Sequence, residues 1–501
     1  MTLSASISIA LLASIGGLAT SSDLLGNVLR DTTACAEIAA CISSKSAVSY
    51  SGSSAYMKDN YHWASSSSQV SACSFEPGTT EDLAKAVQIL GDTRTPFAIK
   101  SGGHATNPGF SSTQGVQIAM SLFSDITFDS DSQTATVGTG AIWDDVYSTL
   151  GEYGVNAIGG KESGIGVGGF VLGGGYSYLT NQYGLAIDNV LAYELVLPNG
   201  TVTTVTGSSY PDLFFGLRIV NVSNSHATTK GGFNNFGIVT YVTLKTYSQS
   251  LVWGGNIAYN QDQLKAVNAA IAKFAADVTD PMASLYSTYN YVSGMPVITC
   301  TLFYDAPTCP NGIFDDFLAI PHEEQDVSTR SFTTMVKDLP SSTPGLRAVF
   351  NVIAIEEWTV SLLNHIANET LFYGDKLGNS VTEITYNVRP YLPSIYDHTD
   401  TPSAYPDSRE QGYSFLELFY AWTDSSNDDL IYDAVTVSSN YIEQLAIAAG
   451  QDVGNVVVYP NDASPSTTVE DIYGNNLARL RDIKKAVDPD NVMGLAGGWK
   501  F

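Results

Sequence analysis

The sequence is poor in basic residues, in cysteine and in histidine. It has 23 Lys and Arg against 50 Asp and Glu, so its formal net charge is -27. Such a chain does not offer a basic surface to nucleic acid or to an anionic membrane. The five cysteines include no C-x-x-C pair and the six histidines are scattered, so we expect no metal site. These shortages exclude nucleic acid as a partner, and the acidity favours solubility.

Charge of either sign is also scarce, at 15% of the chain, while 44% of the residues are apolar. This composition is typical of a globular protein and not of a disordered one. A chain of 501 residues is too long for one hydrophobic core. We therefore expect two large folding units.

The first residues lack charge altogether. Leu3 to Thr20 are apolar or small, and Gly17-Leu18-Ala19 offers small residues for cleavage, as in a signal peptide over residues 1–19. No Lys or Arg precedes this run, but Ser, Gly and Ala dilute it too much for a membrane anchor. We expect a secreted protein with no membrane contact once the signal is removed. Three sequons would then be open to glycosylation: Asn199-Gly-Thr201, Asn221-Val-Ser223 and Asn368-Glu-Thr370.

An odd number of cysteines leaves one unpaired in a secreted chain. Cys300 and Cys309 flank a short Asp-Ala-Pro turn, which makes them a plausible bridge. Cys73 is expected to pair with either Cys35 or Cys41, and the sequence does not choose between them.

Glycine is abundant in one stretch, from Gly159 to Asp188. Its bare backbone N–H groups suit phosphate oxygens. Gly164-Ile-Gly166-Val-Gly168-Gly169 fits G-x-G-x-x-G, and Asp188 stands where a ribose-binding acid is expected. However, Gly173-Gly174-Gly175 interrupts the helix that a dinucleotide fold requires. The stretch predicts a phosphate-contacting loop that is not a Rossmann turn, which disfavours a nicotinamide dehydrogenase.

A second glycine loop, Ser101-Gly102-Gly103-His104-Ala105, follows a short apolar strand over 96–100. Further motifs follow in order: Val137–Trp143, Asp188–Gly200, Pro211–Phe214, Gly231–Thr240, Tyr473–Lys484 and Asp488–Val492. In this order and spacing they resemble the FAD-linked oxidases of the berberine-bridge-enzyme and hexose-oxidase type, in the fungal branch. The resemblance covers residues 45–501.

The resemblance implies an α+β fold of two domains, of the PCMH type found in vanillyl-alcohol-oxidase-like flavoproteins. The FAD-binding domain would span 23–250 and the substrate domain, an antiparallel sheet covered by helices, 251–460. The tail over 461–501, a berberine-like segment, would return to the FAD domain. Periodicity and turn residues predict helices over 33–43, 80–90, 143–150, 263–275 and 430–449, strands over 115–120, 126–129, 135–137 and 414–422, and a hairpin turn at Asn199-Gly200.

FAD is the cofactor that the resemblance implies, with the imidazole of His104 bonded to the flavin 8α-methyl group. Relatives with a second bond carry a cysteine in the second glycine loop, where this chain has Glu162 or a near neighbour, so a single bond is implied. Ile165 stands where relatives gate oxygen, between the Val of an oxidase and the Leu of a dehydrogenase. The cofactor would also contact Ser101, Gly102, Gly103, Ala105, Gly164, Ile165, Gly166, Gly168, Gly169, Gly174, Asp188, Ile238, Val239 and Asn491.

Hydride removal from a C–H bond needs a base for the accompanying proton. Relatives often carry Tyr-x-Asn-Tyr before the tail, and here Asp462 replaces the second Tyr after Tyr459. Asp462 is a candidate base with Tyr459 positioning the substrate; alternatively Asp462 caps the next loop and Tyr459 is structural. In the strand over 414–422, alternation places Glu417 and Tyr420 on opposite faces, so at most one of them faces the flavin.

The sequence thus predicts a secreted FAD-dependent oxidase that takes hydride from a small organic substrate and passes electrons to oxygen, in fungal secondary metabolism. An oligosaccharide oxidase is one alternative. A non-catalytic flavin-binding relative is another, because of Asp462 and because residues 219–230 interrupt the family pattern. That insert is either an extra surface loop or an intron read through in frame. The substrate and the oligomeric state are not encoded in any motif.

Overall fold

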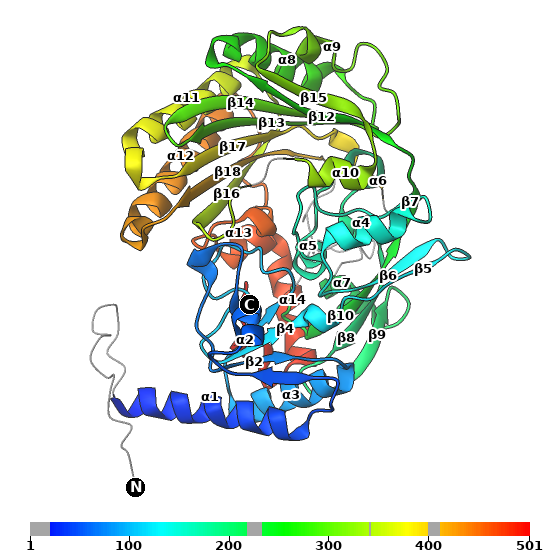
Figure 1. Ribbon diagram of the computed structural model, residues 1–501, viewed down its shortest axis with the longest axis vertical. Coiled ribbons are helices and arrows are strands. Elements are labelled where there is room, and N and C mark those ends of the chain that lie inside the picture. Colours follow the sequence, from blue (N-terminus) through cyan, green and yellow to red (C-terminus); the bar gives the residue numbers. More distant parts are fainter. Residues whose placement is uncertain (1–20, 218–232, 340–341, 399–410) are drawn as a thin grey trace.

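The computed structural model describes residues 21–217, 233–339, 342–398 and 411–501. The predicted signal peptide over 1–19 and the insert over 219–230 lie outside these residues. Figure 1 shows an N-terminal unit (residues 21–248) below a central unit (residues 252–448), with the tail descending between them. The fold is the two-domain α+β architecture that the sequence predicts.

Two sheets build the N-terminal unit. One has the order β1-β2-β4-β3, with β2 and β3 both parallel to β4: β1 (Ala47–Ser49), β2 (Cys73–Glu76), β3 (Phe97–Lys100) and β4 (Val116–Ala119). The other is antiparallel with the order β5-β6-β10-β8-β9: β5 (Ile126–Asp129), β6 (Thr134–Gly138), β8 (Val190–Val196), β9 (Val202–Thr206) and β10 (Ile238–Lys245). A short pair, β7 (Val155–Asn156) and β11 (Tyr247–Ser248), lies beside them. The glycine loop over 101–105 follows β3 of the first sheet, and the glycine-rich stretch from Gly159 follows β7 of the short pair.

Two helices of the N-terminal unit, α2 (Ser54–Asn60) and α3 (Thr80–Thr93), begin after a residue whose side chain caps them. In α3, the side chain of Thr79 accepts a hydrogen bond from the backbone N–H of Asp82, and acidic residues fill the first turn. The other helices are α1 (Ser21–Cys41), α4 (Trp143–Gly151), α5 (Val167–Leu172), α6 (Thr180–Tyr183) and α7 (Pro211–Leu217). Helix α1 is longer than the predicted helix over 33–43, and α4 agrees with the prediction to one residue.

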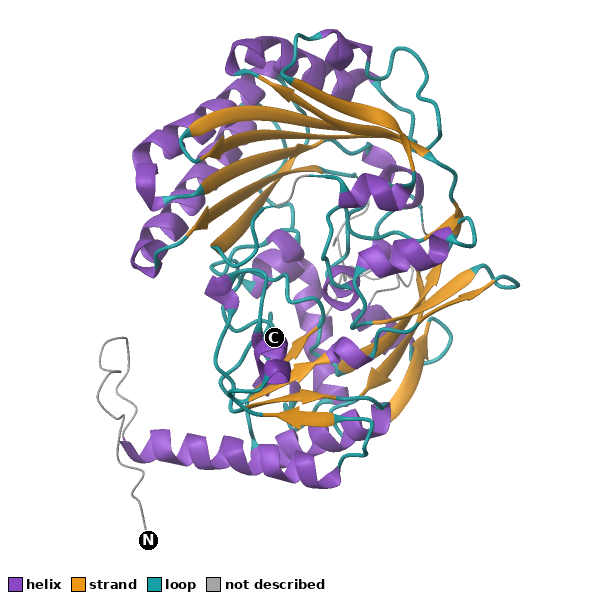
Figure 2. Ribbon diagram, in the orientation of Figure 1, coloured by secondary structure: helices purple, strands orange, loops and turns teal. Residues whose placement is uncertain are grey.

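The central unit is one antiparallel sheet of seven strands in the order β15-β12-β14-β13-β17-β18-β16. The strands are β12 (Val252–Tyr259), β13 (Ala283–Val292), β14 (Met295–Tyr304), β15 (Glu324–Arg330), β16 (Arg347–Ile355), β17 (Glu383–Arg389) and β18 (Ser414–Trp422). Helices α8 (Leu264–Asp277), α9 (Asp315–Ala319), α11 (Val360–Leu377) and α12 (Asp428–Ala448) cover the outer face, as Figure 2 shows. Because the inner face turns toward the N-terminal unit, every residue of β18 is buried.

The chain returns to the N-terminal unit after α12. Helices α13 (Val469–Tyr473) and α14 (Leu477–Val487) pack there, and α10 (Phe332–Lys337) reaches down from the central unit. Ile472 and Leu480 of the tail share a hydrophobic core with Trp143 and Phe215. Among the described residues, no helix has the length and apolar character needed to cross a bilayer.

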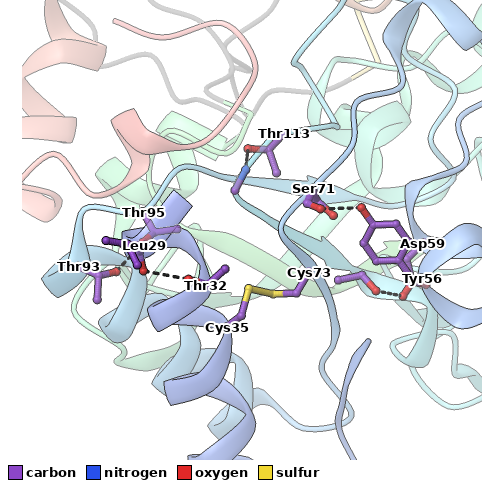
Figure 3. Close-up of a disulfide and its surroundings, with 12 residues drawn as sticks. Leu29, Thr32, Cys35, Tyr56, Asp59, Ser71, Cys73, Thr93, Thr95 and Thr113 are labelled. Carbon is purple, nitrogen blue, oxygen red and sulfur yellow. Dashed lines mark hydrogen bonds between the residues drawn. A yellow bond between two sulfur atoms is a disulfide. The ribbon is translucent and has the colours of Figure 1, made fainter. Parts of the chain in front are cut away.

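One disulfide occurs among the described residues, between Cys35 of α1 and Cys73 of β2 (Figure 3). It resolves the choice that the sequence left open and leaves Cys41 as a free thiol. The predicted bridge between Cys300 and Cys309 is wrong, since both are free. Cys300 lies four residues before the end of β14, roughly 13 Å of extended chain, and points into the core beside Ser287, whereas Cys309 lies beyond the strand.

Candidate active site

The two glycine loops meet between the units. A side chain on Gly102 would approach the backbone nitrogen of Gly166 to 2.6 Å, and one on Gly166 would approach that of Gly102 to 2.2 Å. Neither position therefore has room for a β-carbon. Ser101 fixes the junction, because its hydroxyl donates to the carbonyl of Thr139 at 2.5 Å and accepts from the N–H of Gly168 at 3.2 Å.

A cavity opens at this junction, and residues of both glycine loops, of the central unit and of the tail line it. Most of the predicted cofactor residues line it: Ser101, Gly102, Gly103, His104, Ala105, Ile165, Gly166, Gly168, Gly169, Ile238 and Val239.

Four predicted cofactor residues lie outside this lining, and three of them make hydrogen bonds within the second glycine stretch or to α4. The N–H of Gly164 donates to the carboxylate of Asp144 at 2.8 Å. The carbonyl of Gly174 accepts from the N–H of Ile187, and Asp188 caps its own turn by accepting from the N–H of Leu185. Asn491 has a left-handed backbone, with φ of 49°, in the tail loop after α14.

His104 presents its imidazole to the cavity. Burial lowers the pKa of His104 to about 4, although the negative charge of Glu417 acts in the opposite direction. The ring is therefore neutral at pH 7, the form in which a ring nitrogen is nucleophilic. A tryptophan ring, that of Trp63, stacks on it.

The central unit and the tail together contribute three charged groups to one wall of the cavity. Arg389 at the end of β17 donates from one guanidinium nitrogen to Asp462 at 2.8 Å and from the other to Glu417 of β18. Asn387 donates to the second oxygen of Glu417 at 2.6 Å, and Arg389 also donates to the hydroxyl of Tyr286 at 2.6 Å. One guanidinium thus joins two buried carboxyl groups from separate segments of the chain.

The two carboxyl groups titrate in opposite directions. Burial, and then the charge of Glu417, raise the pKa of Asp462 well above its usual value. Burial also acts to raise the pKa of Glu417, but Arg389 and the hydrogen bonds from Asn387 and Asp462 outweigh it and hold that pKa below its usual value. Glu417 is therefore the member of the pair that ionises more readily, and Asp462 holds a proton more strongly than an ordinary aspartate does.

Lys161 and Glu162 complete the charged wall. The amine of Lys161 donates to the hydroxyl of Tyr391 at 3.0 Å and lies 4.6 Å from the centre of the Tyr286 ring. Burial and the charge of Arg389 put the pKa of Lys161 well below its usual value, while burial and Glu417 raise the pKa of Glu162. Both residues line the cavity.

Tyr459 lines the same wall but is held in the core. Its ring packs edge-on against Tyr176 at 4.8 Å, and its hydroxyl accepts a hydrogen bond from Asn461 at 3.0 Å. Burial, and then the charge of Asp462, raise the pKa of Tyr459, so the phenol stays protonated at neutral pH. Asp462 ends a 3₁₀ turn over Pro460–Asp462.

Strand alternation in β18 is confirmed. Glu417 faces the cavity, whereas the hydroxyl of Tyr420 lies on the opposite face, 2.7 Å from that of Tyr386. Sequence reasoning missed Arg389, Lys161 and Trp63 as members of the site. A charged residue at the end of an apolar strand was the one available signal for Arg389, and Lys161 stood next to the aligned position of Glu162.

Two buried polar side chains in the lining have an atom without a hydrogen-bond partner. Within the described part of the chain, the side-chain oxygens of Asn107 and Ser111 have no hydrogen-bond partner, and both residues line the cavity. The two glycine loops offer backbone amides that can bind the phosphates of a dinucleotide. The unpaired oxygens of Asn107 and Ser111 can bind its polar ring atoms or hydroxyl groups. The residues present fit an FAD.

Comparisons with known proteins agree with this geometry. The family model described as an FAD binding domain matches residues 71–206, and the berberine and berberine-like model matches residues 458–496. The solved structure of glucooligosaccharide oxidase from Acremonium strictum, which concerns a 6-S-cysteinyl, 8α-N1-histidyl FAD, has a TM-score of 0.72 at 18% identity, over 92% of this chain and 97% of that one. The fold is that of the berberine-bridge-enzyme-like flavoenzymes.

Sequence relatives define the family. An uncharacterized FAD-linked oxidoreductase of Arthroderma benhamiae is 30% identical over 437 residues, 83% of this chain and 84% of that protein. The FAD-dependent monooxygenase yanF of Aspergillus niger is 36% identical over 461 residues, 86% of this chain and 73% of that protein. The chain belongs to the FAD-linked oxidoreductase family with a berberine-like tail: it is an enzyme, and its cofactor is FAD.

Proposed function

We propose that this oxidoreductase is an oxidase whose FAD is bonded through its 8α carbon to His104, and that it oxidises a small organic alcohol, amine or sugar with molecular oxygen as the electron acceptor. The observation that carries the proposal is the neutral imidazole of His104 in the cavity wall. His104 follows Gly102, whose backbone packs closely on that of Gly166 in the second glycine stretch. A single bond is proposed, since no cysteine occurs between Cys73 and Cys300.

The bond between FAD and His104 can form in a balanced reaction in which molecular oxygen is the oxidant. The N–H bond of the imidazole and one C–H bond of the 8α-methyl group break, and an N–C bond forms between them. The two electrons and two protons that are released reduce one molecule of oxygen to hydrogen peroxide. The imidazole must be neutral for this step, which the burial of His104 favours.

Bound FAD supplies the acceptor for the substrate hydride. Asp462 is the proposed acceptor of the accompanying proton, because a raised pKa makes its carboxylate a stronger base than that of an ordinary aspartate. Arg389 holds the carboxyl group of Asp462, and Glu417 raises its pKa. Tyr459 is proposed to shape the substrate side of the wall, and Ile165, in the lining, to control the access of oxygen.

Acid precipitation tests the attachment. Wild-type protein that is precipitated with acid and washed is expected to keep its flavin fluorescence, and His104→Ala is expected to lose it. His322→Ala is the matched control, because His322 is exposed in the central unit, away from the cavity. A colourless wild-type pellet would refute the covalent bond.

Products distinguish the candidate activities. An oxidase releases one hydrogen peroxide for each substrate oxidised, whereas a monooxygenase, as yanF is named, puts an atom of labelled oxygen into its product. Peroxide release on a panel of oligosaccharides would favour a carbohydrate oxidase, and a yellow protein without turnover on any panel would favour a non-catalytic relative. A role in fungal secondary metabolism is part of the proposal for the oxidase.

Secretion is also proposed. The Cys35–Cys73 disulfide supports it, because such bridges persist in oxidising compartments. Recovery of the protein from the culture medium, with a cleaved N-terminus and glycosylated sequons, would test it; retention inside the cell would contradict it.

A further inference from the structure

The indole of Trp63 lies flat on the imidazole of His104. The ring centroids are 4.3 Å apart and the planes differ by 17°. The backbone N–H of Trp63 also donates to the carbonyl of Gly103 at 3.0 Å. Trp63 therefore contacts both the ring of the histidine and the backbone of its loop.

The central unit also contacts the indole. Phe350 of β16 lies nearly parallel to it with a centroid distance of 6.2 Å, and Phe419 of β18 lies at 5.8 Å. The N–H of Gly345 donates to the carbonyl of Trp63 at 2.7 Å. The indole thus packs on both His104 and the sheet of the central unit.

Residues 63–66, which we call the strap, continue along the sheet. The N–H of Ser65 donates to the carbonyl of Leu346 at 2.8 Å, and the hydroxyl of Ser66 bonds both the N–H and the carbonyl of Ala348. Since β16 is an outer strand of the seven-stranded sheet, the strap pairs with its open edge. Trp63 is consequently anchored to a rigid element.

The loop that carries His104 gives its ring one hydrogen bond, to the backbone of His104 itself. The two residues before it, Gly102 and Gly103, have no side chains that could pack on the imidazole. The torsion that turns an imidazole is broad. A parallel aromatic ring restricts that torsion and adds stabilisation beyond the area it covers.

We propose that Trp63 is a positioning residue for flavin attachment: its stacked indole holds the imidazole of His104 in the orientation in which a ring nitrogen reaches the flavin 8α carbon. This inference rests on the proposed covalent bond to His104. The indole acts through the histidine and forms no bond to the flavin.

The ratio of acid-stable to total FAD, sampled over time after FAD is added to purified protein produced without it, tests the proposal. For Trp63→Leu we expect total FAD to stay near the wild-type level while the rate of covalent attachment falls about two- to tenfold, the range expected from one aromatic pair. Trp63→Phe keeps a planar ring and should restore most of the attachment. A merely structural role would lower covalent and total FAD together and leave the ratio unchanged.

Trp253→Leu is the matched control, because Trp253 is a half-buried tryptophan that stacks on Phe314 away from the cavity. It should keep the wild-type ratio. If Trp63→Leu does not accumulate, Trp63→Met is measured in its place, since Met fills a similar volume without a planar face. A wild-type ratio in these variants would overturn the inference and leave the bond to His104 standing, whereas a wild-type protein without acid-stable flavin would overturn both.

Discussion

Single charges govern the acid–base behaviour of the cavity wall. Asp462 has a cation, Arg389, on one side and an anion, Glu417, on the other. Each neighbour acts on the pKa of Asp462 with opposite sign, because a nearby negative charge disfavours the carboxylate form and a positive charge favours it. The balance between them sets the pH at which Asp462 can accept a proton.

Removing Glu417 should therefore shift the pH dependence of the reaction. In Glu417→Gln the neighbouring negative charge is gone, so the pKa of Asp462 falls and the acidic limb of kcat/KM moves to lower pH. Asp462→Asn should lower kcat by about 10²- to 10⁴-fold with the flavin still attached. Both are measured as pH profiles of substrate oxidation.

Tyr420→Phe is the control for that series, because its hydroxyl lies on the outer face of β18 and should leave the profile in place. An Asp462→Asn enzyme with the wild-type rate would assign the proton to another group. An acidic limb that stays fixed in Glu417→Gln would show that Asp462 does not control it.

Residues with a motif around them could be predicted, and residues without one could not. His104 follows two glycines and a strand, and Asp462 stands in a short tail motif, so the sequence marks both. Arg389 has no such context: its partners Glu417 and Asp462 lie 28 and 73 residues away along the chain and meet it only through packing. Trp63 likewise gains its role from two units that converge on it.

At the scale of elements, the sequence predicts which side chains of a strand share a face, but it does not predict which face turns toward the cavity. The strand over Ser414–Trp422 agrees with its predicted bounds, and Glu417 and Tyr420 lie on opposite faces as expected. The face that turns to the cavity is decided by α11 and α12, which cover the other one. A strand buried on both faces shows no polar side that would reveal this in advance.

Helix α3 is joined to the loop between α1 and β1 by the carboxylate of Asp82. Asp82 accepts hydrogen bonds from the N–H and hydroxyl of Ser43 and from the hydroxyl of Ser46, and it pairs with Lys85. Burial acts to raise the pKa of Asp82, but these hydrogen bonds outweigh it and lower that pKa far below its usual value. The ionised form is therefore the one that stabilises the fold.

Asp82→Asn should lower the free energy of unfolding by about 1–3 kcal/mol at pH 7, as expected when buried donors lose a charged acceptor. Because the folded pKa lies below the unfolded one, this stabilisation is present above about pH 4 and is lost as the pH falls further. Denaturant unfolding at several pH values measures it. Asp92→Asn, an exposed position of the same helix, should change stability by less than about 0.5 kcal/mol; an equal loss there would contradict the assignment.

At the scale of the whole molecule, the two-domain fold follows from a resemblance that covers most of the chain. The structure shows in addition that the two glycine loops meet at Gly102 and Gly166. The docking of the units could not be predicted, since it depends on contacts such as the strap, which has no sequence pattern. The expected Cys300–Cys309 bridge failed for a related reason: closeness along the chain does not fix which way a strand residue points.

The strap covers an edge of the seven-stranded sheet, at β16, that the central unit itself leaves open. On the opposite border, β15 carries charged residues such as Glu324, Asp326 and Arg330, which discourage pairing with other chains. The border at β16 carries Val349 and Phe350 and relies on the strap from another part of the protein.

A fragment of residues 251–457 should therefore self-associate as its concentration rises, which light scattering can follow, and Phe350→Lys should suppress it. A fragment that stays monomeric would show that the sheet edge is closed without the strap. If the fragment does self-associate, the segment whose Trp63 stacks on His104 also protects the whole enzyme from aggregation at this edge.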